Sequence, residues 1–141
     1  MDTVPSMALF SAKKPLKRNV TWQYEGPVLA DFGHQLSRTY ECPDLFQLDG
    51  KTVAIGALMH YRDKQGRFQQ VRWYVGDLKD TADGPRLQVG NSDWCDFGTG
   101  YYATQSLPTR RPSYRVRLVY RLSRDARGKA VHCQRYDVAT T

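Results

Sequence analysis

The residue types that most often bind metals or carry out redox chemistry are scattered through this sequence. Its three cysteines, Cys42, Cys95 and Cys133, form no Cys-x-x-Cys pair, and its three histidines lie singly, with none at ligand spacing from another. We therefore expect no metal site, no disulfide framework and no cofactor. Free thiols of this kind are typical of proteins in a reducing compartment.

Chemistry based on phosphate contacts would depend on the C-terminal end of the chain. The protein has 21 Lys and Arg against 14 Asp and Glu, which gives a formal net charge of +7. Residues 1–109 contain equal numbers of bases and acids, so the whole excess lies in residues 110–141. The bases there are almost all arginine, which suits bidentate phosphate contact. A solvated basic face is the more common explanation, so we do not expect nucleic acid as the partner.

The elements that must position any site are predicted by short aromatic and β-branched runs separated by turn residues. The expected strands cover residues 7–10, 20–24, 44–48, 52–59, 68–75, 86–89, 100–106 and 114–122. Asp49-Gly50 indicates a tight hairpin turn, because both residue types tolerate positive φ. No segment shows a sustained helical apolar period. The chain is therefore predicted to be all-β, with a strand spacing found in sandwiches, barrels and propeller blades.

Length and hydropathy limit the number of domains and the cellular setting. A chain of 141 residues suits one ordinary domain. Its longest apolar run, residues 53–59, is far shorter than the ~20 residues that span a bilayer, so we expect no membrane span. The first residues show no basic region followed by an apolar one, which predicts a cytoplasmic protein without a secretion signal.

Four segments, in order along the chain, resemble sequence blocks that occur together in one enzyme family. Residues 40–46, Tyr-Glu-Cys-Pro-Asp-Leu-Phe, resemble the family's Glu-Cys-Pro-Asp block. The other three segments are residues 9–28 with their Trp and Gly-Pro, residues 73–77 (Trp-Tyr-Val-Gly-Asp) and residues 96–106 (Asp-Phe-Gly-Thr-Gly-Tyr-Tyr-Ala-Thr-Gln-Ser). One such match would be weak, whereas four in the family's order are specific. Together they resemble glycoside hydrolase family 32, the invertases and fructan hydrolases.

The resemblance implies an incomplete five-bladed β-propeller, of which this chain would form about two to three blades of antiparallel strands. Residues 1–109 would be a partial N-terminal propeller segment, and residues 110–141 a basic segment in which the resemblance is weak. An incomplete propeller leaves strand edges unpaired, so we also expect self-association through those edges.

The resemblance further implies cleavage of β-fructosides such as sucrose, a small-carbohydrate substrate, with retention of configuration. Glu41 matches the family's general acid/base, and Asp96 matches an Asp that hydrogen-bonds sugar hydroxyls. Tyr101 and Tyr102 follow in the same block and are expected to contact the substrate. A retaining glycosidase protonates the leaving oxygen with one carboxyl and attacks with a second carboxylate ~5–5.5 Å away. We expect Glu41 at the end of a strand and facing a concavity. Asp96 and either Tyr101 or Tyr102 should point into the same hollow from the neighbouring blade, with the two carboxyl groups within about 10 Å of each other.

Two blocks that the family places before Glu-Cys have no match in this sequence. The block Trp-Met-Asn-Asp-Pro-Asn-Gly carries the nucleophile, and Arg-Asp-Pro carries an Asp that stabilises the transition state, yet the chain contains no Asp-Pro dipeptide. Without its nucleophile a retaining glycosidase forms no covalent intermediate. We therefore expect a truncated product or fragment of a glycosidase that is inactive on its own.

Two alternatives belong to other classes of protein. The chain could be a non-catalytic carbohydrate- or partner-binding β module, with sugar stacking on Trp73, Trp94, Tyr101 and Tyr102. It could also be a basic nucleic-acid binder that works through its arginine-rich tail, with an affinity that falls steeply with salt. Upstream codons for Asn-Asp-Pro and Arg-Asp-Pro would favour the glycosidase.

Overall fold

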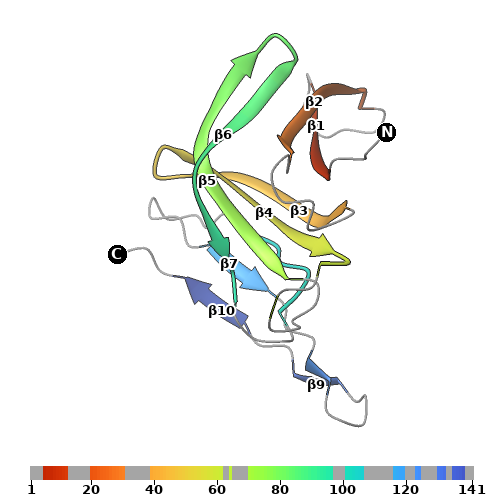
Figure 1. Cartoon of the computed structure of the whole chain (residues 1–141), viewed down its shortest axis with the longest axis vertical. Coiled ribbons are helices and arrows are strands. Elements are labelled where there is room, and N and C mark those ends of the chain that lie inside the picture. The colour runs from red at the N-terminus through yellow and green to blue at the C-terminus, as the bar shows by residue number, and fades with distance from the viewer. Residues whose placement is uncertain are drawn as a thin grey trace.

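The computed structural model describes residues 5–12, 20–30, 39–61, 64, 70–96 and 101–106, together with the backbone of four short strands after residue 115. The regular elements in these ranges are all strands, which confirms the predicted all-β class. Four of them, β3 (Thr39–Leu48), β4 (Lys51–Met59), β5 (Val71–Thr81) and β6 (Gly84–Trp94), form one antiparallel sheet in chain order (Figure 1).

Two tight hairpin turns connect strands of this sheet, and the first is the one that the sequence predicted. Asp49 and Gly50 have φ of +48° and +75°, so both central residues of the β3–β4 turn adopt the left-handed conformation that such turns require. The β5–β6 turn is shorter than expected, because Thr81 Oγ1 accepts from the amide of Asp83 and donates to the carbonyl of Gly84 at 2.7 Å. Pairing therefore continues to Thr81 and Gly84.

Both faces of the four-stranded sheet are covered, and side chains alternate between them along β4. On one face, which we call the hairpin face, Ala54 and Leu58 pack with Tyr40, Tyr74 and Leu87 of the other strands. On the opposite face, which we call the Glu41 face, Val53, Ile55 and Ala57 pack with Val71. Burial on both sides explains why residues 53–59 are continuously apolar rather than alternating.

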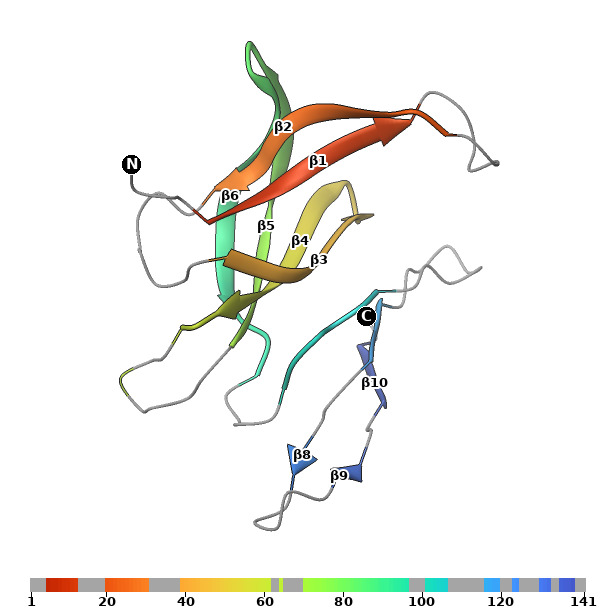
Figure 2. The same ribbon diagram turned by 90° about the vertical axis from the view of Figure 1, so that its right-hand side faces the viewer.

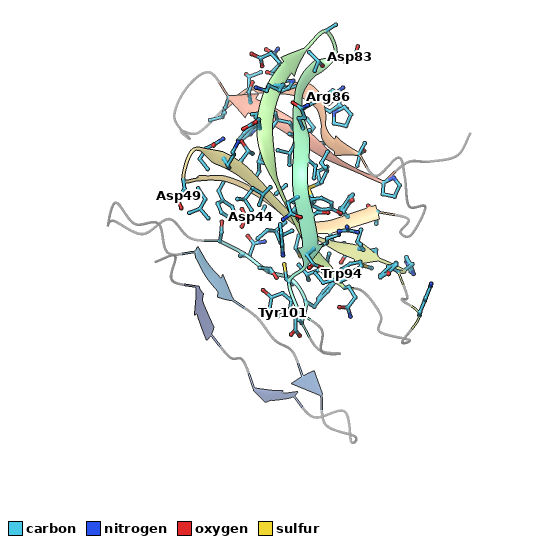
Figure 3. The ribbon with its side chains drawn as sticks, turned by 60° about the vertical axis from the view of Figure 1, so that its left-hand side comes forward. Asp44, Asp49, Asp83, Arg86, Trp94 and Tyr101 are labelled. Carbon is cyan, nitrogen blue, oxygen red and sulfur yellow. The ribbon has the colours of Figure 1, made fainter. Side chains whose placement is uncertain are left out.

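A separate two-stranded hairpin covers the hairpin face (Figure 2). It pairs β1 (Ser6–Ala12) with β2 (Trp22–Ala30) and contributes Met7, Val28 and Leu29 to the core. The tip of the β5–β6 hairpin, where Figure 3 labels Asp83 and Arg86, approaches β2 closely. A Cβ added to Gly84, whose φ is +97°, would lie 1.8 Å from the carbonyl oxygen of Glu25. Only glycine therefore fits at this crossing.

Three strands of the sheet, β3, β5 and β6, extend beyond the predicted ranges 44–48, 68–75 and 86–89, and two other predicted strands differ in their course. The strand expected at residues 20–24 instead runs from Trp22 to Ala30, because the β1–β2 ladder continues past the Gly-Pro pair with register shifts. Residues 100–106 were expected to form a strand, but the described part, 101–106, contains only an isolated bridge at Tyr101. Ala103 in this segment has a φ of +57°, which breaks the extended conformation.

Two small antiparallel pairs follow in the C-terminal part of the chain. The first joins β7 (Val116–Val119), within the expected strand 114–122, to β10 (Arg135–Val138). The second joins β8 (Ser123–Arg124) to β9 (Ala130–His132). In both ribbon views the four-stranded sheet lies between these pairs and β1–β2. Among the described residues, no helix is long and apolar enough to cross a membrane.

Candidate active site

A β-bulge in β3 determines how the Glu-Cys-Pro-Asp block is presented. Glu41 pairs with Ala57 and Asp44 pairs with Ile55, so Cys42 and Pro43 together oppose the single residue between those partners. Cys42 takes a φ of +48°, and Pro43 has no amide hydrogen to donate to the ladder. The bulge therefore lies directly between the two acidic residues.

The bulge places both acidic side chains on the Glu41 face. In a regular strand, residues three apart point to opposite faces of the sheet. The extra residue changes that parity, so Glu41 and Asp44 share a face with their cross-strand partners, Ala57 and Ile55. Both partners belong to the apolar cluster of this face. Two carboxylates are thus brought to the edge of an apolar surface.

The segment of residues 101–106 covers this face and bonds to both carboxylates. The hydroxyl of Tyr102 donates a hydrogen bond to Oε2 of Glu41 and lies 3.4 Å from Sδ of Met59. The backbone amide of Ser106 donates to Oδ2 of Asp44 at 2.5 Å. Tyr101 and Tyr102 also pack against the apolar cluster. The structure thus brings one of the expected tyrosines to Glu41, while substrate binding by either tyrosine stays a prediction.

Glu41 itself is half-buried and lies inside β3 rather than at its end. The expectation of a strand end was wrong, because Thr39 and Tyr40 already pair with Met59 and Leu58 before the bulge. A carboxylate at a bulge is held by backbone on both sides, which fixes its direction more firmly than a loop would.

Asp96 follows the last strand of the sheet and is half-buried. The amide of Cys95 donates to the carbonyl of Val71 at 2.9 Å, and Val71 pairs with Ala57, the partner of Glu41. Cys95 therefore ends the row of residues that starts at Glu41, and Asp96 follows the same sheet rather than lying on a neighbouring blade. The expected convergence of Asp96 with Glu41 stays a prediction. Burial of the Cys95 thiol, followed by the charge of Asp96, raises the pKa of Cys95 to about 12. This thiol is protonated at neutral pH.

The four aromatic residues of the sugar-stacking alternative do not share one face. Trp73, Tyr101 and Tyr102 pack on the Glu41 face. Trp94 packs on the hairpin face, where its ring stacks on Tyr61 with centroids 5.1 Å apart. The guanidinium of Arg72 also lies 5.0 Å from the centre of the Trp94 ring. A single platform made of all four rings is therefore excluded by the geometry.

Asp44 and Ser106 lie within two of the family-like sequence blocks, but the sequence did not predict that either residue belongs to the site. The only available signal was the proline within a strand, which is confined to edges and bulges. Within the described ranges, no group of three His, Cys, Asp or Glu side chains could hold a metal ion. Cys42 and Cys95 are free thiols, and Cys133 lies outside the described residues.

Comparison with protein families and curated proteins identifies relatives of this chain. Residues 6–135 match the Glycosyl hydrolases family 32 N-terminal domain. The chain is 33% identical over 96 residues to the sucrose-6-phosphate hydrolase of Bacillus subtilis (strain 168), a stretch that covers 61% of this chain and 19% of that protein. The family match crosses residue 109, and the proposed division at that residue stays a prediction.

Two solved structures resemble the fold. A glycoside hydrolase family 32 protein from Bifidobacterium adolescentis is 75% identical, with a TM-score of 0.76 over 82% of this chain and 18% of its own. The GH32 β-fructofuranosidase BmSUC1 of Bombyx mori is 25% identical, with a TM-score of 0.55 over 70% of this chain and 21% of its own. The chain thus spans about a fifth of these relatives. It belongs to glycoside hydrolase family 32, and its antiparallel sheets are a fragment of that family's five-bladed propeller.

Proposed function

We propose that this chain carries the acid/base half of a retaining β-fructofuranosidase site, with a small β-fructoside as substrate. The observation that supports this role is the Glu41 carboxyl, held at a bulge on a partly apolar face and bonded by the Tyr102 hydroxyl. Family membership and the names of two relatives, a sucrose-6-phosphate hydrolase and a β-fructofuranosidase, point to fructosides as the substrate class.

The hydrogen bond from Tyr102 occupies Oε2 of Glu41, so the proton would be transferred from Oε1. In the first step, Oε1–H would protonate the glycosidic oxygen as the bond to the fructosyl carbon breaks. In the second step, the resulting carboxylate would take a proton from the water that attacks the fructosyl intermediate. Asp96 would accept hydrogen bonds from sugar hydroxyls. Fixing one carboxyl oxygen orients the other, which is how positioning lowers such a barrier.

The second carboxylate of the reaction has no counterpart among the motifs of this chain. A retaining mechanism needs a nucleophile on the other side of the sugar ring, and the sequence contains no Asp-Pro dipeptide. We therefore infer that the 141-residue chain alone hydrolyses sucrose no faster than the background rate. Turnover that disappears in Glu41→Gln would contradict this inference and imply another carboxylate, with Asp96 examined first.

The acid/base role is best tested in a complete propeller. Residues 6–106 of this chain would replace the matching segment of the Bifidobacterium adolescentis protein, and hydrolysis of a β-fructoside that the parent cleaves would be measured. Glu41→Gln should lower kcat by about 10²- to 10⁴-fold, as expected for loss of a general acid. The first step with fructosyl fluoride should suffer far less, because fluoride leaves without a proton. Azide, which needs no deprotonation, should restore turnover and give fructosyl azide.

The matched control is Glu25→Gln, since Glu25 lies on β2 and accepts a hydrogen bond from Ser11, away from the Glu41 face. Its activity should equal that of the parent graft. Equal losses in Glu41→Gln with good and poor leaving groups, without azide rescue, would contradict the acid/base role.

A further inference from the structure

The segment of residues 101–106 is held on the Glu41 face without belonging to a strand. At one end of the segment, the backbone amide of Ser106 donates to the Asp44 carboxylate. At the other end of the segment, the Tyr102 hydroxyl donates to Glu41. Two acidic residues of one strand therefore fix the two ends of one segment.

The backbone is strained both in β3 and in the segment of residues 101–106, between the residues that form these two contacts. Four described non-glycine residues have positive φ, and two of them are Cys42, between the acidic residues, and Ala103, between the two residues bonded to them. A side chain with a Cβ disfavours this conformation, which persists only where the surroundings impose it. Between the two contacts, Thr104 is only 1% exposed, so packing also fixes the middle of the segment.

From these contacts we propose that Asp44 is a positioning residue: its carboxylate anchors the backbone of residues 101–106 and thereby places the Tyr102 hydroxyl on Glu41. The inference rests on the proposed function of Glu41. Asp44 itself transfers no proton and acts through Tyr102. The bulge at Cys42 and Pro43 then serves both residues, because it directs Glu41, the acid/base, and Asp44, its anchor, to the same face of the sheet.

The main competing explanation is that Asp44 acts by its charge alone. Asn and Leu have the branching of Asp, but only Asn keeps an oxygen that can accept from the Ser106 amide. An anchor therefore tolerates Asp44→Asn and fails in Asp44→Leu, whereas a charge effect fails equally in both variants.

Hydrogen–deuterium exchange at the Ser106 amide tests the anchor in the full 141-residue chain, independently of activity. We expect this amide to be protected in the parent and in Asp44→Asn, and to exchange at least ten-fold faster in Asp44→Leu. Asp80→Leu, at the exposed end of β5, is the matched control and should leave the protection unchanged. Equal protection in Asp44→Leu and the parent would overturn the anchor. If Asp44→Leu does not fold, Asp44→Ala replaces it in the same comparison.

Kinetics in the grafted enzyme then test the positioning role. Asp44→Leu and Tyr102→Phe should each lower kcat by roughly ten- to a hundred-fold with KM almost unchanged, the scale expected for misplacement by about an ångström. The double variant should lose no more than either single variant, and Asp44→Asn should stay near the parent. Additive losses, or equal losses in Asp44→Asn and Asp44→Leu, would overturn the proposal. A Glu41→Gln variant with parental activity would instead contradict the proposed function, while the exchange result would still decide the anchor.

Discussion

The two faces of the four-stranded sheet are built in opposite ways. On the hairpin face, β1 and β2 cover a core in which Leu58 is completely buried and the hydroxyls of Tyr40 and Tyr74 bond to each other at 2.8 Å. On the Glu41 face, an irregular segment covers the sheet, two backbone positions are strained, and tyrosine and backbone donors bond to carboxylates. On the hairpin face two buried tyrosine hydroxyls bond to each other, whereas on the Glu41 face a tyrosine hydroxyl and a backbone amide bond to carboxylates.

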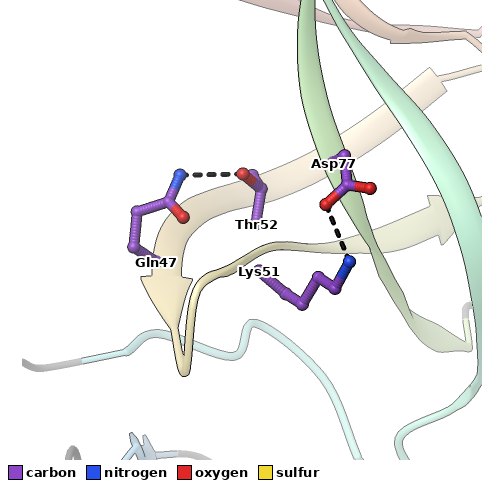
Figure 4. A network of polar contacts seen from close by, with 4 residues as sticks. All are labelled: Gln47, Lys51, Thr52 and Asp77. Atoms are coloured by element: carbon purple, nitrogen blue, oxygen red, sulfur yellow. Dashed lines mark hydrogen bonds and ion pairs between the residues drawn. The ribbon is translucent and has the colours of Figure 1, made fainter.

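The two faces also differ at the β3–β4 turn, where one side of β4 carries a buried hydrogen bond and the other an exposed ion pair (Figure 4). Thr52, which is 3% exposed, accepts from Nε2 of Gln47 at 2.7 Å. Its neighbour Lys51 points to the other side of β4 and forms an exposed ion pair with Asp77 at 2.9 Å. Mutations on the hairpin face should therefore act mainly on stability, and those on the Glu41 face mainly on turnover.

The largest effect is expected from Leu58→Ala, because Leu58 has no solvent exposure on the hairpin face. Removing the side chain loses its transfer free energy and leaves a cavity, which should lower the free energy of unfolding by about 2–5 kcal/mol. Urea unfolding measures the loss. Leu78→Ala, at a position that is 39% exposed on β5, is the control and should cost far less. Similar losses in the two variants would mean that the hairpin face is not the stabilising core.

The alkaline limit of stability should depend on Cys95. Burial and the charge of Asp96 raise the pKa of this thiol to about 12, above its ordinary value of 9.0. Between these values the unfolded chain loses the proton while the folded chain keeps it, so stability is complete below pH 9 and falls as pH rises toward 12. At pH 10 the loss should be about 1 kcal/mol.

Cys95→Ala should show a smaller fall in the urea midpoint between pH 7.5 and pH 10 than the parent. Cys42→Ala, which removes a half-buried thiol at the bulge, should fall as the parent does. Parallel falls in the parent and in Cys95→Ala would show that this thiol does not titrate differently on folding.

The features of the two faces that depend on neighbouring residues in the sequence could be predicted, whereas those that depend on distant residues could not. The continuous apolar run in β4 and the Asp49-Gly50 turn predicted the central hairpin, because burial and turn conformation follow local residue types. The four matching blocks likewise identified the family and singled out Glu41.

The covering segment could not be predicted in the same way. Residues 101–106 contain tyrosines and threonine that favour strands, but the Asp44 side chain takes the Ser106 amide and Ala103 turns left-handed. The hydrogen bond depends on a residue 62 positions earlier in the chain. The shared face of Glu41 and Asp44 could not be predicted either. Regular alternation along a strand would put these two residues on opposite faces, and only the bulge at Cys42 brings them to the same one.

Two tyrosine hydroxyls, one on each face, offer the most direct test of the comparison. Tyr40→Phe removes the buried hydrogen bond to Tyr74 and should lower the free energy of unfolding by about 1 kcal/mol without changing kcat in the grafted enzyme. Tyr102→Phe should do the reverse, with a small change in stability and the kcat loss described above. Losses of stability and turnover that go together in both variants would remove the distinction between the two faces.

The smallest effect is expected at the ion pair between Lys51 and Asp77, which have side-chain exposures of 55% and 45%. The hydrogen bond and charge of Lys51 hold the pKa of Asp77 below its ordinary value of 3.8. As pH falls, the unfolded chain binds this proton first, so the contribution to stability is present above pH 3.8 and is lost below the lowered pKa.

Solvent and salt screen such exposed pairs strongly, so Asp77→Asn should lower the urea midpoint only slightly at pH 7 and low ionic strength. The difference from the parent should vanish in 1 M salt, at a pH below the lowered pKa of Asp77, and in a Lys51→Met background. Asp80→Asn, on the same strand, should show no such dependence on Lys51. A difference that survives high salt would mean that Asp77 stabilises the sheet through packing or hydrogen bonding rather than charge. The Glu41 face near Lys51 and Asp77 would then contribute to stability in the same way as the hairpin face.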